Sequence, residues 1–414
     1  MKTHFDVAVV GAGAVGCACA LWTQEAGFDV VLIDKSEPGA GASFGNAGIF
    51  STSGCIPVNS PALFRDLPKM TLRTDSPLSI NWFYAITHLP WMLRFLRQCT
   101  PERVRHISEK LALILGHTEA GMMPLIERAG AQGLLDEVAP LYLYGSEQSF
   151  NSGKGGIERR RELGVRLDIL DEAEVRELEP HIRAPVFKAL RFTDSSFIRN
   201  PGALVKRLAE KFSADGGTII EGSVDACTAN ENLVAIAIGD EKTIMCEKLI
   251  LAAGAHSTKI KGTGAEHLPL DTERGYHIAY HGHQDKLSRP VGSADGGFYA
   301  SPMDTGLRLA GTVEIAGTEN PPSPKRLAYL QGWAEKMFGD MGEPDETWLG
   351  FRPTMPDSLP VIGPAKNNPN ILLAFGHQHL GLTMSGITGR VISDLVQGRA
   401  PNFDISSFSP ARFE

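Results

Sequence analysis

The fold is decided near the start of the chain by the stretch Phe5-Asp6-Val7-Ala8-Val9-Val10-Gly11-Ala12-Gly13-Ala14-Val15-Gly16. Residues 7–10 form an apolar run that is typical of a short, fully buried strand. Glycines follow at once in the G-x-G-x-x-G spacing, and a helix of small and apolar residues begins at Cys17. A second apolar run, residues 29–33, ends at Asp34. This order of strand, glycine turn, helix and strand predicts a dinucleotide-binding unit.

Each residue of the motif has a physical task. Gly11 permits the tight turn, Gly13 lets the backbone approach a pyrophosphate, and Gly16 lets the helix pack closely on the strand. The helix N-terminus offers free N–H groups and roughly half a positive charge to the phosphates. Asp34 follows the first glycines by about 20 residues, which places it to accept the ribose hydroxyls. A glycine turn without a ligand is the weaker interpretation, because the motif lies between two apolar strands and has its acidic partner.

Composition limits the class of protein. A chain of 414 residues exceeds one ordinary hydrophobic core, so we expect two lobes. The formal charge of -8 argues against nucleic-acid binding. The compact basic cluster Arg159-Arg160-Arg161 is explained more simply as a solvated helix face.

The cysteines indicate no metal site and no disulfide framework. None of the six forms a C-x-x-C pair, and no Cys/His group has zinc-finger spacing. Reduced thiols and a cytoplasmic location fit best. The chain enters the nucleotide-binding strand directly, which leaves no room for a signal peptide.

Residues 77–98 are aromatic and apolar with a cationic end. Asn81, His88 and Pro90 interrupt the run, whereas a transmembrane helix needs about 20 apolar residues in a row. The segment is therefore either a packed helix pair or an interfacial patch that brings the protein to the inner membrane. The sequence does not decide between these alternatives.

The rest of the chain alternates between helices and strands. We expect helices over 102–131 and 155–180, and a helix over 201–212 that Asn200 caps. Residues 224–246 predict an antiparallel meander, and residues 270–315 alternate like a sheet. A strand over 371–375, a glycine-rich turn and a further helix close the chain.

These pieces together resemble the FAD-dependent D-amino-acid oxidase superfamily, which includes glycine and sarcosine oxidases and bacterial D-amino-acid dehydrogenases. The likeness covers four ordered pieces: 9–34, 41–48, 249–257, and 349–363 followed by 376–385. It is closest to the small-subunit type of D-amino-acid dehydrogenase. That closer likeness depends on the loop Ser43-Phe44-Gly45-Asn46-Ala47-Gly48, the Arg-Asn-Pro-Gly run at 199–202, and the turn at 376–384.

The resemblance implies an α/β fold (α+β overall) with a discontinuous FAD-binding, Rossmann-like domain. That domain would comprise residues 1–79, 150–264 and 346–414. Residues 80–149 and 265–345 would form a substrate-binding domain with a mainly antiparallel sheet.

The resemblance also implies where FAD would lie. The ADP half would be held by Gly11, Gly13, Ala14, Val15, Gly16, Asp34 and Lys35, the adenine by Val224, and the pyrophosphate also by Ala253 and Gly254. The flavin side would be lined by Ser43, Asn46 and Gly48, with Gly381, Leu382 and Thr383 aiming N–H groups at the N1/O2 edge. Some relatives bond the flavin through a cysteine just beyond the Gly-x-Arg-Pro motif. This chain has Met355 and no thiol there, so non-covalent FAD is expected.

Substrate residues follow from the same likeness. Arg352 matches the arginine that binds the substrate carboxylate in the family, and a planar guanidinium suits that task. Tyr276 lies where relatives bring a strand to the substrate, yet it could equally be a core aromatic. His379 and His377 flank the flavin turn, where either could face the pocket or bond the backbone. Tyr299 is a weaker candidate.

The implied reaction is oxidative deamination of D-amino acids. Hydride would pass from Cα to flavin N5, and the imino acid would hydrolyse to a keto acid and ammonia. Electrons would go to a quinone or another acceptor than oxygen. The alternative is a secondary-amine enzyme that acts on D-proline, hydroxy-D-proline, sarcosine or glycine. A nicotinamide-dependent dehydrogenase and a flavin-binding sensor without turnover are rivals that the C-terminal turn and Arg352, respectively, disfavour.

Overall fold

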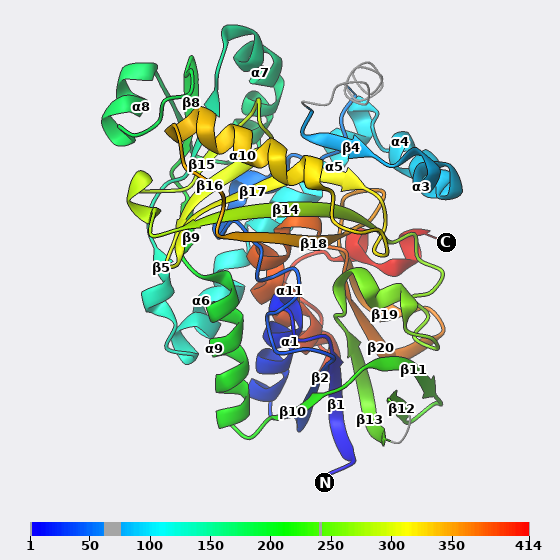
Figure 1. Ribbon diagram of the computed structural model, residues 1–414. Helices are drawn as coiled ribbons and strands as arrows, with labels where there is room; N and C mark the ends of the chain where they lie inside the picture. The colour runs from blue at the N-terminus through cyan, green and yellow to red at the C-terminus, as the bar shows by residue number, and fades with distance from the viewer. Residues whose placement is uncertain (1, 62–75, 240–241, 414) are drawn as a thin grey trace.

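A computed structural model describes residues 2–61, 76–239 and 242–413 (Figure 1). Its nucleotide-binding sheet, sheet A, has five parallel strands in the order β10-β2-β1-β13-β20. Their bounds are Thr218–Glu221, Val30–Asp34, His4–Val10, Lys242–Leu251 and Asn368–Phe375. Because all five run the same way, their carboxyl ends meet at one edge of the sheet, where ligands of open α/β sheets bind.

Sheet A branches at β13. The first half of β13 pairs with β12 (Val234–Ile238) and through it with β11 (Val224–Ala229), both antiparallel. Residues 249–251 of β13 pair with β20 instead, and β19 (Val361–Ala365) follows on β20. The predicted meander over 224–246 is therefore confirmed.

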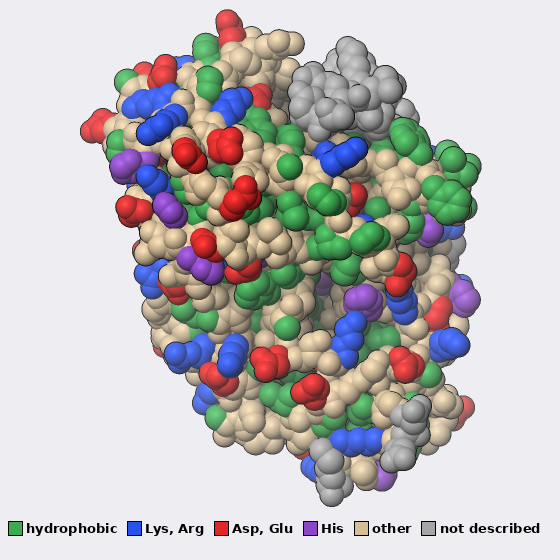
Figure 2. Space-filling view, viewed as in Figure 1, with side chains coloured by type: hydrophobic (Ala, Val, Ile, Leu, Met, Phe, Trp, Pro, Cys, Tyr) green, Lys and Arg blue, Asp and Glu red, His purple; other side chains and the backbone are tan. Residues whose placement is uncertain are grey.

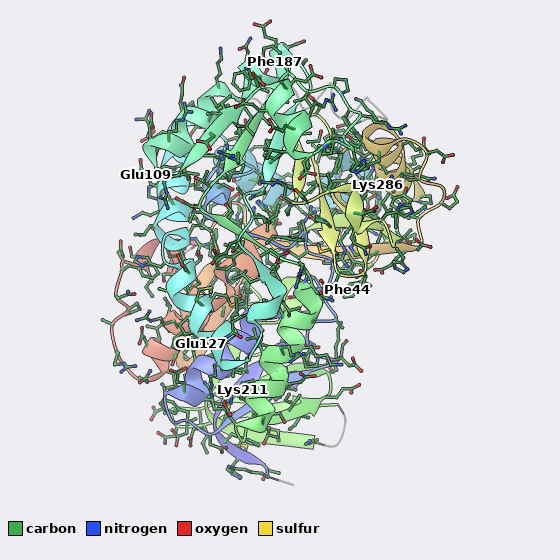
Figure 3. All side chains as sticks on the ribbon, turned by 90° about the vertical axis from the view of Figure 1, so that its left-hand side faces the viewer. Phe44, Glu109, Glu127, Phe187, Lys211 and Lys286 are labelled. Atoms are coloured by element: carbon green, nitrogen blue, oxygen red, sulfur yellow. The ribbon has the colours of Figure 1, made fainter. Side chains whose placement is uncertain are left out.

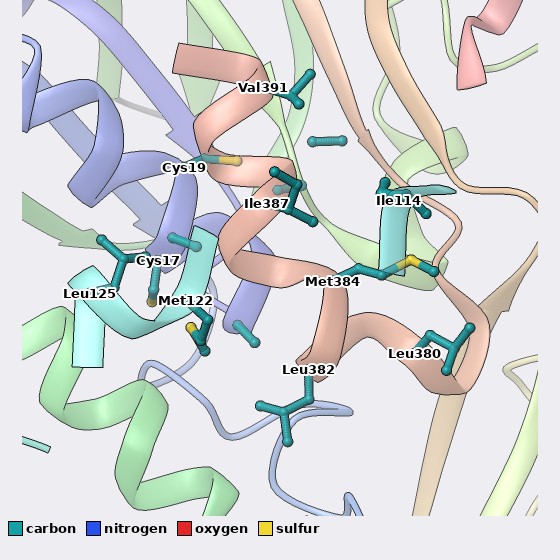
Figure 4. Packing of buried hydrophobic residues seen from close by; sticks show 14 of the residues in the cluster. Cys17, Cys19, Ile114, Met122, Leu125, Leu380, Leu382, Met384, Ile387 and Val391 are labelled. Carbon is teal, nitrogen blue, oxygen red and sulfur yellow. The ribbon is translucent and has the colours of Figure 1, made fainter. Parts of the chain in front are cut away.

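One face of sheet A is covered by α1 (Ala14–Glu25), α9 (Pro201–Ala214) and α11 (Gly381–Val396). Against these helices pack α5 (Pro101–Leu115) and α6 (Thr118–Arg128). Helices α1 and α11 cross very closely, because a Cβ on Gly389 would lie 2.6 Å from the Ala18 carbonyl carbon. Figure 4 shows the resulting core, in which Cys17 and Cys19 lie among apolar side chains of α6 and α11. All six cysteines are buried and free.

A second, larger sheet lies above sheet A in Figure 1. This sheet C has the order β18-β14-β17-β16-β15-β6-β8-β7, with β4 added on β17. The bounds are Glu346–Thr354, Asp271–His281, Gly306–Ile315, Phe298–Met303, Val291–Ser293, Leu141–Tyr144, Lys188–Phe192, Leu167–Leu170 and Leu78–Ile80. Its pairs are antiparallel except β15·β6 and β17·β4. Helix α10 (Pro324–Phe338) covers the face that points away from sheet A.

Smaller elements complete the chain. A third sheet, sheet B, contains β3 (Ile49–Ser51), β9 (Ser195–Ile198) and β5 (Leu135–Asp136). The remaining α-helices of the described residues are α3 (Trp82–Thr87), α4 (Leu89–Arg97), α7 (Glu147–Glu162) and α8 (Glu172–Leu178). The Asn200 side chain accepts a hydrogen bond from the Ala203 N–H and caps α9, as predicted. The predicted helix over 155–180 is interrupted by β7.

The α/β fold with a mainly antiparallel second sheet is confirmed, whereas the sheets divide the chain differently from the predicted domain ranges in three places. Residues 150–192 contribute β7 and β8 to sheet C, and β18 also belongs to sheet C. In the other direction, α5 and α6 pack in the core of α1 and α11, although they fall within the predicted substrate range of 80–149. Helical periodicity shows that a helix has an apolar face, but it does not show which sheet that face covers.

Segment 77–98 forms β4, α3 and α4. Figure 2 shows a green group of hydrophobic side chains at the right-hand edge, at the place of α3 in Figure 1. Phe83 is 80% exposed, and Trp82, Ile86, Leu89 and Leu93 are exposed as well. No helix of the described residues is long and apolar enough to cross a bilayer.

Candidate active site

A cavity of about 1160 Å³ lies between the carboxyl end of sheet A and the facing side of sheet C. It begins near Val224 and Asp34, follows the glycine turn after β1, and ends under Arg352 and Gly275 of sheet C. Pockets for one small molecule are typically about 300–1000 Å³. The size and the extended lining suit a dinucleotide together with a small substrate.

The glycine turn has the geometry that the motif predicts. Gly11 has a φ of +107°, and a Cβ there would lie 2.4 Å from the Ala252 carbonyl oxygen. A Cβ on Gly16 would lie 1.7 Å from the Gly11 carbonyl oxygen, so only glycine lets α1 begin this close to β1. Gly13 lines the cavity at the start of α1 and, as the N-cap residue, has no side chain that covers the helix end. A phosphate can therefore approach the helix end.

Asp34 is held at the end of β2 by two backbone donors. Its Oδ2 accepts a hydrogen bond from the Ala12 N–H at 2.6 Å, and its Oδ1 accepts one from the Ser36 N–H at 3.0 Å. A carboxylate has further lone pairs, so Asp34 can still accept ribose hydroxyls. Nearby, burial lowers the pKa of His256, and the charges of Lys35 and Lys259 lower it further. That neighbourhood favours an anion.

Loop 41–48 ties the two sheets together. The Ser43 hydroxyl accepts a hydrogen bond from the Ala14 N–H at 3.0 Å, and the Asn46 side chain accepts one from Gly48. From sheet C, Arg308 donates to the carbonyls of Phe44 and Asn46 at 2.8 and 3.2 Å. Figure 3 shows Phe44 between α9 and the strands of sheet C. The loop is thus fixed against the cavity from both sides.

The turn between β20 and α11 closes the other side of the cavity. Gln378 has a φ of +50° and donates to the Ser358 hydroxyl at 3.0 Å. Helix α11 begins at Gly381, and no side chain caps its N-terminus. The Thr383 hydroxyl donates to the Ile49 carbonyl at 3.2 Å, which joins this turn to β3. The uncapped end of α11 faces the cavity and can stabilise negative charge there.

Arg352 lies on β18 and lines the cavity. Its guanidinium donates to the Thr312 carbonyl at 2.8 Å and to the Gly311 carbonyl at 3.4 Å. A Cβ on Gly275 would lie 2.4 Å from Nη2, so glycine leaves the space that the guanidinium fills. No carboxylate of the described residues forms an ion pair with Arg352. Burial lowers its pKa from the ordinary value and the Glu273 charge opposes that shift, so this cation is suited to an anionic ligand.

The β17 backbone at this point is irregular. The pairing of β14 with β17 shifts between Arg274 and Tyr276, and Thr312 has a φ of +58°. A bulge with a non-glycine residue in the left-handed region is strained. Here it turns the Thr312 carbonyl toward Arg352.

The two predicted histidines differ. His377 bonds Thr388 of α11 at 2.9 Å, and burial lowers its pKa to about 3. The His379 side chain is exposed to the cavity but enclosed by the protein around it. That enclosure, together with the Arg352 charge, lowers its pKa to about 4. Both histidines contribute to the cavity lining, but the His377 ring is engaged by α11, whereas the His379 side chain is exposed to the cavity.

Most predicted site residues line one cavity. They are Gly11, Gly13, Ala14, Val15, Asp34, Lys35, Ser43, Asn46, Val224, Ala253, Gly254, Gly381, Leu382, Thr383, Arg352, His379 and Tyr299. Gly16 does not line it and serves the packing of α1 instead. Gly48, expected beside the flavin, packs on β9, where a Cβ would lie 2.3 Å from the Ile198 carbonyl oxygen.

Tyr276 also differs from its predicted place. It contributes to the lining, but its ring packs in the core under α10. Its hydroxyl donates to Glu314 at 2.5 Å and accepts from the Ser323 N–H at 3.0 Å. The hydroxyl is thus engaged on the opposite face of sheet C from Arg352, because successive residues of a strand alternate between faces.

Three of the lining residues that the sequence interpretation missed bear on the chemistry of the site. Glu273 is buried beside Arg352, Trp348 lies over Gly45 and Gly350, and Arg160 donates to the Ser53 carbonyl at 2.9 Å. Arg160 corrects the view of 159–161 as a wholly solvated face. Glu273 and Gly275 are two residues apart on one strand, so the sequence alone indicated that they share a face. Nothing in the sequence near Arg160 indicated that α7 lies next to this cavity.

The fold and the cavity are those of a class of oxidoreductases with a dinucleotide site at the edge of a parallel sheet, and Arg352 under the second sheet is suited to a small anion. The profile of the family described as FAD-dependent oxidoreductase (DAO) matches residues 6–395. The chain belongs to this family of FAD-dependent oxidoreductases.

Similar proteins agree with this assignment. The chain is 33% identical to a D-amino-acid oxidase of Bradyrhizobium diazoefficiens over 98% of both chains. It is 29% identical to D-amino acid dehydrogenase 2 of Mesorhizobium japonicum over 96% of this chain and 98% of that one. The crystal structure of glycine oxidase from Geobacillus kaustophilus shares the fold, with a TM-score of 0.76, 21% identity and 99% coverage of both chains.

The residues present fit FAD. The glycine cradle admits a pyrophosphate, Asp34 closes the ribose end, and the uncapped α11 N-terminus can meet the negative edge of a flavin. No cysteine occurs among the described residues that line the cavity. The described residues also contain no cluster of three or more potential metal ligands.

Proposed function

We propose that the protein oxidises the Cα–N bond of D-amino acids and passes the electrons to a quinone or another acceptor than oxygen. FAD would be bound without a covalent link. The single observation that carries the substrate class is Arg352, a half-buried guanidinium in the cavity that no described carboxylate neutralises. The names of the similar oxidase and dehydrogenases supply the D configuration.

In this proposal Arg352 binds the substrate carboxylate. Thr312 and Gly311 hold the guanidinium in one orientation, so the substrate is bound in a fixed pose. A fixed pose lowers the barrier because the reacting atoms need not search for their alignment. Sheet C covers the substrate and excludes water, while the α11 N-terminus stabilises the charge that develops on the opposite side.

The reaction balances as a two-electron oxidation. FAD, when bound, would supply the two-electron acceptor for the hydride from Cα. The amine nitrogen loses a proton as the C=N bond forms. Water then hydrolyses the imino acid to a keto acid and ammonia. His379 is neutral in the working pH range and borders this space, so it can accept or donate a hydrogen bond without adding charge.

A substrate panel tests the proposal. The purified holoenzyme is mixed anaerobically with D- and L-amino acids, D-proline, hydroxy-D-proline, sarcosine and glycine, and bleaching of the flavin absorption is followed. We expect reduction by D-amino acids and not by their enantiomers. Reduction by the cyclic and N-methyl compounds alone would make the enzyme a secondary-amine oxidoreductase.

The acceptor needs a separate measurement. We expect turnover with a soluble quinone or dye to exceed peroxide formation in air by at least about tenfold. Equal rates with oxygen as the sole acceptor would make the enzyme an oxidase, like its Bradyrhizobium relative in name. Acid precipitation should release the flavin into the supernatant.

We also propose that the α3–α4 surface contacts a membrane from the cytoplasmic side. Five large apolar side chains are exposed there, and Arg94 and Arg97 follow in the last turn of α4 (Figure 2). Apolar insertion next to cations suits an anionic lipid surface.

A vesicle-binding measurement tests this contact. The double variant Phe83→Ser/Ile86→Ser should no longer sediment with phosphatidylglycerol vesicles. Phe187→Ser, which changes an exposed aromatic elsewhere, should still sediment with them; equal loss in both would refute the contact.

A further inference from the structure

Glu273 is a buried carboxylate on the cavity side of sheet C that has no bonded partner among the described residues. It is 5% exposed and lines the cavity. Glu273 and Arg352 are directly opposite each other on β14 and β18, so their side chains share one face. Even so, no ion pair joins them, and no described residue donates a hydrogen bond to the Glu273 carboxylate. The charges of Arg352 and Asp271 act on it only from farther away.

The geometry of Arg352 explains why the two charges stay apart. The guanidinium bends over Gly275, two residues along β14 from Glu273 on the same face. There it donates to the Gly311 and Thr312 carbonyls of β17. The space that Gly275 leaves therefore draws the cation away from its opposite neighbour. The result is a separated cation and anion on one wall of the cavity.

A buried carboxylate without a partner is expensive, and such groups are normally paired in folded proteins. Burial raises the pKa of Glu273, which is the usual response to a missing cation. An amino acid carries a carboxylate and an ammonium group on the same carbon. The cavity wall offers the complementary pair, with Arg352 for the first group and Glu273 for the second.

We propose that the Glu273 carboxylate binds the amino group of the substrate and thereby makes the site selective for amino acids over other carboxylic acids. This inference rests on the proposed function, in which Arg352 binds the substrate carboxylate. Glu273 fixes the nitrogen while Arg352 fixes the carboxylate. The two contacts together determine the orientation of the hydrogen and the side chain on Cα. Hydroxy acids and simple carboxylates make only the first contact.

The test compares two ligands that differ only at the amine position. 2-Aminoisobutyrate has no hydrogen on Cα and cannot be oxidised by hydride loss, and pivalate replaces its ammonium group with a methyl group. Both are titrated into holoenzyme, and Kd is read from the change in the flavin absorption spectrum. Wild type should bind 2-aminoisobutyrate more tightly than pivalate. Glu273→Gln should weaken 2-aminoisobutyrate by about 10- to 100-fold, the range for a hydrogen bond to a charged group, and leave pivalate unchanged or tighter.

Asp271→Asn is the matched control. Asp271 lies on the same strand and the same face, and it is also buried with a raised pKa. However, it bonds the Tyr84 hydroxyl at 2.7 Å and does not line the cavity. Its removal should leave the ratio of the two dissociation constants unchanged. Glu273→Asp keeps the charge on a shorter side chain and should restore part of the selectivity.

The outcomes separate the possible failures. If Glu273→Gln weakens both ligands equally, Glu273 only supports Arg352 and the inference is wrong. If Glu273→Gln changes neither ligand, the carboxylate does not meet the amine and the inference is wrong as well. If wild type shows the selectivity and Glu273→Gln loses it, yet no D-amino acid reduces the flavin, then the proposed function fails while the amine site stands.

Discussion

Strand β14 and its neighbours carry arginines on both faces of sheet C, and the two arginines differ in their partners. On the face under α10, Arg274 is fully buried, pairs with Glu314 at 3.3 Å and donates to the Asn320 and Pro321 carbonyls at 2.9 Å. On the cavity face, Arg352 of the neighbouring strand has only backbone carbonyls as partners. The first arginine is neutralised and serves the structure. The second is held in place but left charged, which is what binding an anion requires.

The same contrast applies to the acids. Glu314 accepts from Tyr276 and pairs with Arg274, whereas Glu273 has no bonded partner among the described residues. For these two pairs, the charges are paired under α10 and have no charged partner on the cavity face. Buried charges without a partner are rare in native proteins and are often found where a ligand binds. This difference supports a substrate site on the cavity side of sheet C.

The largest effect should be a loss of stability when one partner of the ion pair under α10 is removed. Arg274→Met leaves Glu314 buried without its cation, and removing one partner of a buried pair typically costs about 3 to 5 kcal/mol. The free energy of unfolding, measured by urea denaturation of the holoenzyme, should fall by that amount. The kcat/KM of the folded protein should stay within about threefold. The double variant Arg274→Met/Glu314→Gln should regain stability, and a double variant as unstable as the single one would contradict the pairing.

Arg352→Met should have the opposite effect to Arg274→Met, with a loss of activity and little change in stability. No carboxylate loses a bonded partner, so stability and flavin content should stay near wild type. The kcat/KM for a D-amino acid should fall by about 100-fold, or about 3 kcal/mol, because a charge-assisted bidentate contact is lost. Arg352→Lys should recover only part, since a point charge lacks the planar fork. Full activity of Arg352→Met at normal flavin occupancy would place the carboxylate site elsewhere.

Acid pH should also lower the stability of the protein through a histidine on the cavity face of sheet C. His277 stacks on Trp348 at 5.2 Å between ring centres and bonds Glu346 at 3.0 Å. Burial and the Arg308 charge outweigh the opposing effect of Glu346 and lower the pKa of His277 to about 4. In the unfolded chain its pKa is about 6.5, so below that pH the unfolded state binds a proton that the native state does not. Stability is therefore lost as pH falls from about 6.5 toward 4, by about 1 to 2 kcal/mol at pH 5.

His277→Phe keeps an aromatic ring but cannot bind a proton. The difference in unfolding free energy between pH 7 and pH 5 should shrink by that same 1 to 2 kcal/mol. The comparison uses the slope with pH, so a uniform loss of stability in the variant does not matter. An unchanged slope would show that His277 is not the acid-sensitive group.

The sequence could predict those features that depend on residues close together along the chain. The nucleotide motif is complete within residues 5–34, and its spacing, its glycines and Asp34 are all local, so it could be recognised directly. Arg352 was found because the family motif around it is also local. The N-cap of α9 needed only Asn200 and the proline after it.

The features that the sequence did not predict depend on long-range pairing. Which residues of β14 face the cavity is determined by its register with β18 and by the bulge on β17, and a shift of one residue exchanges Tyr276 with Gly275 or His277. Arg160 reaches the cavity from α7, more than a hundred residues from the glycine turn in sequence. Its role could not be read from neighbouring residues.

Gly275→Ala tests the space between the two charges directly. The added Cβ would lie 2.4 Å from Arg352 Nη2, so the guanidinium must move while the backbone can stay. Misplacing the carboxylate contact should lower kcat/KM by about tenfold with flavin content unchanged. Stability should change little, because the displaced group is the end of a flexible side chain. A stability loss above that of Arg274→Met would mean that the strand itself is deformed.

Tyr276→Phe should have the smallest effect and is the sharpest test of which face each residue serves. The hydroxyl donates to Glu314 and accepts from Ser323, both on the α10 side, so its loss removes two hydrogen bonds from the satisfied network. Because Arg274 still neutralises Glu314, the expected loss of stability is only about 1 kcal/mol. The kcat/KM for a D-amino acid should remain within about twofold of wild type, since the hydroxyl does not share a face with Arg352. If instead kcat/KM falls by 100-fold at unchanged stability, the hydroxyl leaves Glu314 during turnover and reaches the substrate. The division of β14 into a structural face and a substrate face would then be wrong at the residue nearest to Gly275.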